Sequence, residues 1–441
     1  MSLLAGCGSD TTTDQKTNSE TNAGSTADGE STVGGESIDP NSITTITINM
    51  DTDNTNEGIR AVAALAEEKI GVRVEFDERA GGDDGTNVVK TYLTSGDMAD
   101  ICVYNSGAKL SALNPSQYFV DLSDNTELMS RIDETFIDAV TFDEATYGVP
   151  ACASQSGAVL YNKELYAQYN LEVPETWEEF LANCEVLEEA GVTSVLGSFA
   201  DSWTCQVPLL GDNANVLAQA PDFITNMSAG TDKYATNQYA LRSWEKLTEL
   251  TSYYNDDYVT TTYNDCCDRL VAGEGGHWMI LTMALGNIQK LYGEEVDKIG
   301  VFAIPADDAE TTTLTTWMPN GMYVNKNSEN VEAAIKFLEF FVTDEALDCF
   351  TETIAPNGPY CIKGYELPDS AYEGVAVDMQ AYFDAGKTGL AAEFITDVMG
   401  PDCSQITQEA GSGQTTAEEA AAKYDDNCKL QAQQIGYDWA Q

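Results

Sequence analysis

The sequence predicts an α/β protein whose sheets of mostly parallel strands carry helices on their faces. Strand-like and helix-like segments alternate from about residue 43 onward, which is typical of parallel strands joined by crossover helices. The alternation persists through the later part of the chain. At 441 residues the chain is also too long for one small core, and a prior of roughly 150 residues per domain predicts two or three domains.

The first strand and helix units follow one another without a break. Residues 43–50 alternate and are β-branched, as in a strand, and apolar residues at helical spacing over 59–70 predict a helix. Residues 72–76 and 99–105 form the next two predicted strands, and the apolar residues at 88–93 predict a helix between them.

One later helix start is marked by its own chemistry. Thr176 and Glu179 have the S/T-x-x-E spacing of a capping box, in which each side chain satisfies a backbone N–H that the new helix leaves open. Pro174, just upstream, cannot continue the preceding helix. The elements predicted in the rest of the chain are helices near 176–190, 237–253 and 331–343 and strands near 195–199, 278–282 and 299–304.

The chain is strongly acidic, with 73 Asp and Glu against 21 Lys and Arg, a net charge of −52. Such a surface repels nucleic acid and anionic lipid, so we exclude both as partners. No run of about 18 apolar residues that could span a membrane occurs in the sequence. At physiological salt these charges are screened beyond about 8 Å, so they say little about a ligand in a deep cleft.

The eleven cysteines and the single histidine, His277, show none of the tight spacings of zinc sites. No phosphate-binding loop or nucleophile elbow occurs either. We therefore expect no metal and no cofactor. Apart from Cys7, ten cysteines remain, and these could form disulfides in a secreted chain or stay as buried thiols. We expect mostly free thiols.

Residues 8–41 differ in composition from the rest of the chain. They are rich in Ser, Thr, Gly, Asp, Asn and Glu and hold almost no apolar residue, so they cannot bury enough surface to offset chain entropy. We expect a disordered tether. The four residues before it, Leu4-Ala5-Gly6-Cys7, resemble the bacterial lipobox, in which the Cys becomes the lipidated first residue. This resemblance implies contact with a membrane only through a lipid anchor on Cys7.

Seven segments carry a wider resemblance. One is the stretch 161–180, with YNKELY and PETWEEF. The others are YLTSGDMADICVYN, YGVPACASQSGAVLYNKEL, LVAGEGGHWMIL, KIGVFAIPA, GMYVNKNSENVEAAIKFLEFFVTDEAL and GSGQTTAEEAAAKYDDN. In this order they resemble the extracellular solute-binding proteins of ABC importers, the maltose-binding-protein group in particular, and the resemblance extends over nearly all of residues 43–435.

The resemblance implies a two-lobed fold like that of periplasmic binding proteins, with hinge crossings between lobes and one ligand between them. We expect 1–41 to be the lipobox remnant and tether, 42–152 with 304–326 the N-terminal lobe, and 153–303 with 327–441 the C-terminal lobe. This arrangement is physically consistent, because ligands in open α/β sheets bind beyond the carboxyl ends of the strands, and a hinge lets both lobes grip them.

Sugar binding needs flat apolar faces against pyranose C–H surfaces and planar polar groups for hydroxyls. Trp203, Trp278 and Trp317 lie in or beside segments where the family lines its cleft, so we take them as candidates. Trp177 and Trp244 are interpreted as core residues. After the strand near 278–282 the loop TMALGN lacks the aromatic residue that the family commonly supplies, which argues against a long stacked oligosaccharide.

The polar candidates stand at positions that the family uses in its cleft. Asp51 follows the first strand, where maltose-binding-like proteins place a hydroxyl-binding Asp. Gln155 takes a position often held by Glu, and its amide can donate as well as accept hydrogen bonds. The other polar candidates are Asp53, Tyr104, Asn105, Asp201, Tyr360 and Asp397.

We therefore expect a substrate-binding lipoprotein rather than an enzyme. It would capture a short oligosaccharide and deliver it to the permease of an ABC importer. We expect a monomer, anchored outside the cytoplasmic membrane of a Gram-positive bacterium. Two alternatives stay open. The same fold could hold another solute such as a polyamine, which Asp51, Asp53 and Asp201 would suit. A cell-surface glycosidase would need two carboxyl groups about 5–10 Å apart.

Overall fold

The computed structural model describes residues 42–52, 56–354, 356, 358–365, 375–437 and 439. All of them lie within one compact unit, Ile38–Gln441. The expected tether, Cys7 and Asp53 lie outside the described residues.

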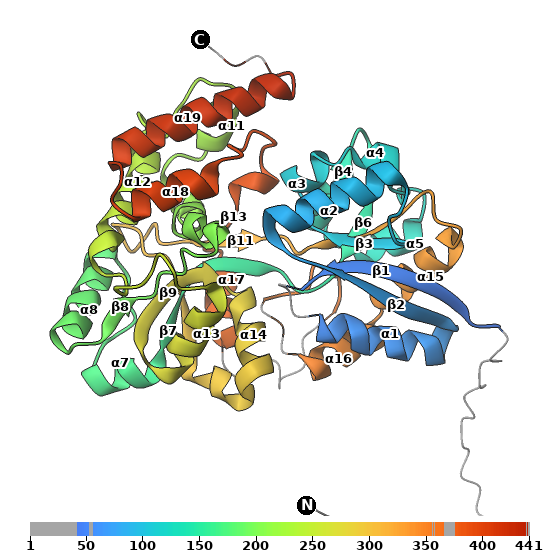
Figure 1. Ribbon diagram of the computed structural model, residues 1–441, viewed down its shortest axis with the longest axis horizontal. Helices are drawn as coiled ribbons and strands as arrows, with labels where there is room; N and C mark the ends of the chain where they lie inside the picture. The colour runs from blue at the N-terminus through green and yellow to red at the C-terminus, as the bar shows by residue number, and fades with distance from the viewer. Residues whose placement is uncertain are drawn as a thin grey trace, which may run out of the picture. The chain divides into compact units, whose positions relative to one another are not determined.

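The first sheet has five strands in the order β2-β1-β3-β12-β6. Their bounds are Thr44–Asp51 (β1), Val72–Arg79 (β2), Ile101–Tyr104 (β3), Gly148–Pro150 (β6) and Gly321–Val324 (β12). Strand β1 runs parallel to β2 and β3, whereas β12 runs antiparallel to β3 and β6. Figure 1 shows α1 (Glu57–Ile70) and α16 (Asp344–Thr353) on one face of this sheet and α2 (Gly82–Ser95) on the other.

Helix α1 illustrates how the sequence pattern builds this core. Its buried residues include Ile59, Val62, Ala63 and Ala66, which share one helical face. Gly71 ends the helix with a φ of 68°, and its N–H bonds to the carbonyl of Ala66, as in a left-handed cap. The remaining elements around the first sheet are α3 (Ala108–Ser111), α4 (Pro115–Tyr118), α5 (Thr126–Arg131), α6 (Glu134–Ala139), β4 (Thr141–Phe142), β5 (Ala145–Thr146) and α15 (Val331–Phe341).

The second sheet has six strands, ordered β13-β11-β7-β9-β8, with β10 also paired to β7. Their bounds are Gln155–Asn162 (β7), Thr193–Val195 (β8), Gly275–Leu281 (β9), Ile299–Ala303 (β10), Leu314–Trp317 (β11) and Thr388–Leu390 (β13). Strand β7 runs antiparallel to β9, β10 and β11, while β8 parallels β9 and β13 parallels β11.

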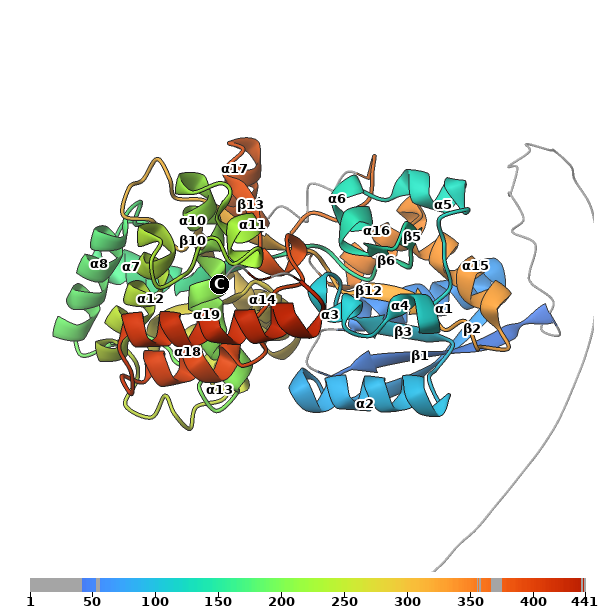
Figure 2. The same ribbon diagram turned by 90° about the horizontal axis from the view of Figure 1, so that it is seen from above.

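Helices surround this second sheet. The α-helices are α7 (Lys163–Tyr169), α8 (Trp177–Glu189), α9 (Val207–Gly211), α10 (Asn213–Gln219), α11 (Phe223–Ser228), α12 (Gln238–Glu249), α13 (Tyr263–Ala272), α14 (Met283–Tyr292), α17 (Val375–Asp384), α18 (Cys403–Gly411) and α19 (Ala417–Gln434). Short 3-10 helices are η2 (Ser202–Gln206), η3 (Leu250–Ser252), η4 (Gly293–Lys298) and η6 (Ala392–Phe394). Figure 2 shows α18 and α19 side by side, and both share a core with α12.

The capping box predicted at the start of α8 is confirmed. Thr176 Oγ1 accepts a hydrogen bond from the Glu179 N–H at 3.3 Å, and the Glu179 carboxylate accepts one from the Thr176 N–H at 3.2 Å. Trp177 is 2% exposed and its Nε1–H donates to Glu249 at 2.6 Å. Trp244 is fully buried. The interpretation of both tryptophans as core residues is confirmed.

The predicted alternation of strands and helices is confirmed, but both sheets are mixed rather than mostly parallel. Strands β6, β7, β11 and β12 run antiparallel to neighbours because the chain reverses direction where it passes from one sheet to the other. The predicted strand 195–199 is also displaced, since β8 ends at Val195. Periodicity alone does not report strand direction, which explains the difference.

The two cores also divide the chain differently from the predicted lobe boundaries. Helices α15 and α16 pack into the core of the first sheet, whereas the predicted C-terminal lobe includes 327–441. Strand β11 belongs to the second sheet, whereas the predicted N-terminal lobe includes 304–326. An apolar stripe such as that of α15 predicts that one face of the helix is buried, but it does not predict which sheet covers that face.

The cysteines of the folded part are unpaired. All ten, from Cys102 to Cys428, are free thiols, and most are buried. Burial raises the pKa of the Cys102 thiol to about 11. These residues therefore pack as small apolar groups, in agreement with the expected free thiols.

A buried ion pair holds the segment that leads into β11. Lys246 Nζ lies 2.8 Å from the Asp212 carboxylate, and their side chains are 5% and 3% exposed. Ser243 and Asn215 also donate to this carboxylate, at 2.6 and 2.7 Å. Lys246 donates to the carbonyl of Pro305 at 2.8 Å. The network therefore fixes the chain at Pro305, at the start of the segment that leads to the strand carrying Trp317.

We expect Lys246→Met to lower the free energy of unfolding by about 3–5 kcal/mol, because it leaves the Asp212 carboxylate buried without its cation. Guanidinium denaturation followed by circular dichroism measures this loss. The matched control is Lys363→Met. Lys363 pairs with Glu134 at 3.2 Å with side chains 44% and 85% exposed, and this change should cost less than about 1 kcal/mol. Equal losses for the two variants would contradict the stabilising role of the buried pair.

Candidate functional site

Several segments bring their residues to one edge of the second sheet. Strand β7 begins at Gln155, and Trp317, the last residue of β11, pairs with it. Leu281, the last residue of β9, pairs with Gly157 two positions along β7. Strand β13 runs parallel to β11, so Glu393, which follows it, reaches the same edge. The register therefore gathers an indole, an amide and a carboxylate.

The Trp317 side chain is held on its face and at its N–H. It is 8% exposed. Its ring lies over Gly157, where a Cβ would come within 2.6 Å of the indole. Its indole N–H hydrogen bonds to Glu393. Only a small part of the ring remains for contact with a ligand.

The first sheet presents its own polar residues at the carboxyl ends of its parallel strands. Asp51 ends β1, and Arg79 Nη2 lies 3.8 Å from its carboxylate. Tyr104 ends β3, is 4% exposed and places its hydroxyl 3.2 Å from Thr86 Oγ1. Asn105 follows and is half-buried. Three of the predicted residues thus lie along this edge.

Two short links require these edges to face each other. Only residues 151–154 join β6 to β7, and only 318–320 join β11 to β12. Ser106 at the first edge donates to the Pro319 carbonyl at 2.8 Å, and the Ala151 N–H donates to the Asn320 carbonyl at 2.8 Å. The carboxyl ends of the two sheets are therefore neighbours, as expected for a site between two lobes.

Trp203 is the least buried of the candidate tryptophans. It lies in η2, is half-buried, and its ring centre is 5.4 Å from that of Tyr263. The Asp201 carboxylate accepts a hydrogen bond from the Tyr263 N–H at 2.7 Å. Trp278 is 1% exposed and its Nε1–H donates to Ser198 at 3.2 Å. Trp203 thus stays partly exposed although it packs against the core, whereas Trp278 lies in the core.

Tyr360 is half-buried and lies next to the link between β6 and β7, since the carbonyl of the preceding Pro359 accepts hydrogen bonds from the Ser154 N–H and hydroxyl, both at 2.9 Å. It packs against Phe350 and Tyr365 with ring centres 5.9 and 5.5 Å apart, and its hydroxyl is 3.1 Å from Thr351 Oγ1. These partners belong to α16 and the segment after it. Tyr360 therefore packs against the core of the first sheet, beside the link to the second sheet.

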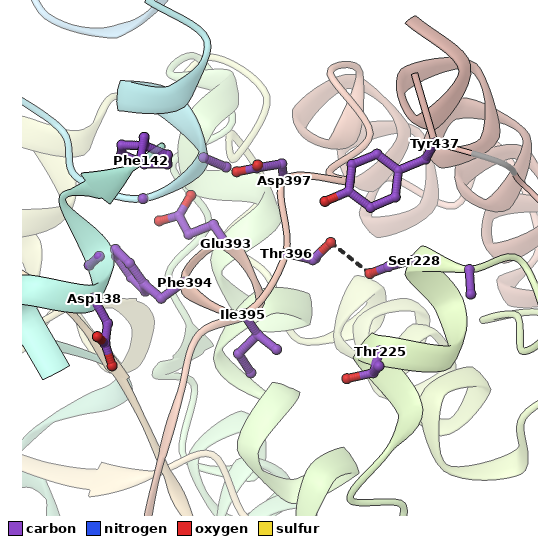
Figure 3. Close-up of a pocket in the computed structure, with 14 residues that line it drawn as sticks. Asp138, Phe142, Thr225, Ser228, Glu393, Phe394, Ile395, Thr396, Asp397 and Tyr437 are labelled. Carbon is purple, nitrogen blue, oxygen red and sulfur yellow. Dashed lines mark hydrogen bonds between the residues drawn. The ribbon is translucent and has the colours of Figure 1, made fainter. Parts of the chain in front are cut away.

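A cavity of about 500 Å³ lies where residues of both sheets meet. Asp138 and Phe142 line it from the side of the first sheet, and Glu393, Asp397 and Tyr437 from the side of the second. Figure 3 shows these acidic and aromatic side chains around it, together with the hydrogen bond from Ser228 to Thr396, 2.6 Å between their oxygens. The volume is within the range of small-molecule sites.

Two of these carboxyl groups have raised pKa values. Burial raises the pKa of Glu393, against the charge of Lys109 and the hydrogen bond from Trp317, which lower it. Burial likewise raises the pKa of Asp397, against a hydrogen bond from Ser111. Lys109 and Ser111 both lie on α3, so each carboxyl group is influenced from the opposite sheet.

Gly107 makes this approach of the two sides possible. Its φ is +66°, and a Cβ there would lie 2.7 Å from the Glu393 carbonyl oxygen and 2.8 Å from the Phe394 ring. A larger residue would meet both a disfavoured backbone conformation and a close backbone atom. The start of α3 is thereby placed against η6.

The structure thus separates the predicted site residues into groups. Gln155 and Trp317 adjoin each other, Asp201 directly precedes η2, which holds Trp203, and Asp397 lines the cavity. Asp51, Tyr104 and Asn105 share the first edge. Trp278 lies in the core of the second sheet, and Tyr360 is half-buried against the core of the first.

Several lining residues have no counterpart in the sequence predictions. Glu393 lies four residues before Asp397, in the same segment, so that segment is the one signal that could have found it. Asp138, Phe142 and Tyr437 occur in no motif, and the tertiary structure alone places them at the cavity. Among the described residues, no cluster of His, Cys, Asp or Glu could hold a metal ion, and no helix is long and apolar enough to cross a membrane.

Two curated relatives match part of the chain. A multiple sugar-binding protein of Streptococcus mutans is 21% identical over 293 residues, which is 64% of this chain and 67% of the relative. An uncharacterised ABC transporter extracellular-binding protein of Pyrococcus horikoshii is 22% identical over 211 residues, and the match spans 47% of each chain.

Solved structures show the same fold. A solute-binding protein, RafE, in complex with raffinose has a TM-score of 0.72 at 17% identity, covering 88% of this chain and 100% of that one. A chitin oligosaccharide binding protein has a TM-score of 0.73 at 19% identity, covering 89% and 99%. A sugar transporter of Bacillus licheniformis in complex with stachyose has a TM-score of 0.66 at 18% identity, covering 88% and 100%. The expected two-lobed α/β fold is confirmed.

The model of the bacterial extracellular solute-binding proteins matches residues 52–348. This stretch includes both sheets except β1 and β13, and both short links between them. Because the match spans well over half of the chain, this protein belongs to the bacterial extracellular solute-binding protein family.

Proposed function

We propose that this protein captures a carbohydrate, in the form of a short oligosaccharide, between its two lobes and delivers it to the permease of an ABC importer. The observation that carries the proposal is the gathering of the Trp317 indole and several polar groups on two facing sheet edges, with the partly exposed Trp203 in η2 as a further aromatic side chain. Trp203 offers a flat apolar surface, and Gln155, Asp51 and Glu393 offer hydrogen-bonding groups for hydroxyls. The sugar-binding names of a relative and of several structural neighbours support this class of ligand.

The role is binding without turnover. It rests on the family, whose members and structural neighbours are binding proteins. We further propose that Cys7 carries the lipid anchor of a monomer held outside a Gram-positive cytoplasmic membrane. As the lobes of this hinged molecule, we propose 42–152 with 320–365 and 153–319 with 375–441, because the two sheets and their cores divide in this way.

A polyamine is the second candidate ligand. The acidic residues Asp138, Glu393 and Asp397 line the cavity together with aromatic rings, and this combination suits ammonium groups as well as hydroxyls.

A thermal-shift panel separates the two classes, since a ligand that binds only the folded state raises the melting temperature. The probes are raffinose, stachyose, chitotriose, xylotriose, spermidine and putrescine. Stabilisation by a neutral sugar supports the proposal. Stabilisation by the polyamines alone would refute the proposal of a sugar ligand. Release of smaller sugars during long incubation would indicate an enzyme.

We expect Trp203→Ala to weaken sugar binding by about tenfold or more, because the ligand loses a stacking face. Isothermal titration calorimetry measures the affinity, and a thermal melt without ligand shows that the variant folds. The comparison variant is Trp278→Phe. Trp278 is buried in the core, so this change should lower the melting temperature and leave the affinity of the folded protein unchanged. Unaltered affinity in Trp203→Ala would exclude the indole from the site.

We expect Gly107→Ala to weaken binding and to lower the free energy of unfolding by about 1–3 kcal/mol, through the disfavoured φ and the contact with Glu393. Calorimetric titration and chemical denaturation measure the two effects. The control, Gly96→Ala, also lies at positive φ, +84°, but a Cβ there meets no atom within 4 Å. It should cost stability and leave affinity intact. Equal affinities in the two variants would show that the contact of α3 with η6 is not needed for binding.

A further inference from the structure

We propose that Glu393 selects against glycans that carry a carboxylate, so that this site takes neutral oligosaccharides and rejects those containing uronic acids. The inference rests on the proposed carbohydrate-binding function. It adds a specificity-determining residue and a chemical boundary to the class of ligand.

The charges around the cavity are of one sign. Its charged lining residues are Asp138, Glu393 and Asp397, and none of its lining residues is basic. Asp138 is exposed, so solvent ions screen it, whereas Glu393 and Asp397 are half-buried and are screened less. A ligand carboxylate that enters would therefore meet two weakly screened negative charges.

Of the two half-buried carboxyl groups, Glu393 is the better placed to repel a ligand carboxylate. Its carboxylate accepts a hydrogen bond from the Trp317 indole N–H, and its main-chain oxygen lies against Gly107. The side chain and the backbone are thus held from two directions.

The remaining acceptor capacity of this carboxylate defines what it can bind. An ionised carboxylate has about four lone-pair sites and no donor. One site is used by Trp317, so others remain for a ligand hydroxyl, which can donate. A uronic acid carboxylate also only accepts, so it gains no hydrogen bond there and is repelled.

Lys109 does not cancel this effect. Burial raises the pKa of Glu393, whereas the charge of Lys109 opposes this shift and so favours the ionised form that repels an anion. The lysine is exposed and is not among the residues that line the cavity.

The test uses two matched pairs of probes on the full chain. The first pair is xylotriose and the same trisaccharide with one glucuronic acid branch, and the second is galactotriose and trigalacturonic acid. The measured quantity is the ratio of the dissociation constants of the acidic and the neutral member, for wild type and for Glu393→Gln. The glutamine keeps the size of the side chain and an oxygen that can accept from Trp317. We expect it to reduce the ratio by about tenfold or more, mainly by improved binding of the acidic glycan.

The matched control is Glu329→Gln, which makes the same change of net charge at an exposed position before α15. It should leave the ratio unchanged. A second arm repeats the titrations at about 0.5 M salt, where charges in open solvent are screened within a few ångströms. The effect of Glu393→Gln should persist there, because the carboxylate is half-buried.

Two outcomes would overturn the inference alone. A ratio that is the same in Glu393→Gln and wild type, with neutral glycans still bound, would do so. So would a ratio that falls equally in Glu329→Gln or disappears in high salt, since the net charge of −52 would then be responsible. Failure of every neutral sugar of both panels to bind wild type would instead refute the proposed function, and the inference with it.

Discussion

The antiparallel pairing of β7 with β11 is the constraint on which the candidate site depends. It places Trp317 opposite Gln155, so the strand that enters the second lobe and the strand that leaves it lie side by side. Because each is joined to the first sheet by only a few residues, the carboxyl edges of the two sheets must be neighbours. A different register would move Trp317 to the other face and separate it from Glu393.

Buried hydrogen bonds and a buried ion pair fix the segment that leads into β11, and so stabilise its pairing with β7. Asn215 donates to the Ile304 carbonyl at 2.7 Å and accepts from the Thr313 N–H at 2.8 Å. With the buried pair of Asp212 and Lys246, these bonds fix both ends of the segment before β11. A loop held in this way by buried, satisfied polar groups is more rigid than one held by surface contacts. The site is thus carried by a strand whose approach is fixed.

Charge acts at two distances in this protein. The net charge of −52 is spread over the surface and is screened within about a Debye length. The carboxyl groups of Glu393 and Asp397 are half-buried, and burial raises the pKa of each, which shows that their surroundings are poorly solvated. Only the half-buried carboxyl groups, which are weakly screened, can influence the choice of ligand. The acidic composition of the chain therefore does not predict the charge of the ligand, whereas the positions of Glu393 and Asp397 do.

The sequence by itself determined the local elements and the family. The cap at Thr176 and the stripe of α1 depend on residues a few positions apart, so their patterns are readable in one dimension. The order of the motifs likewise identified the solute-binding family, which the match over 52–348 confirms. Strand direction, the sheet that α15 covers, and the burial of Trp278 were decided by the tertiary structure. So was the meeting of Asp138, Phe142, Glu393 and Tyr437, whose positions span most of the chain. Contacts between residues so far apart in sequence leave no periodic pattern, because they exist only once the two sheets are linked edge to edge.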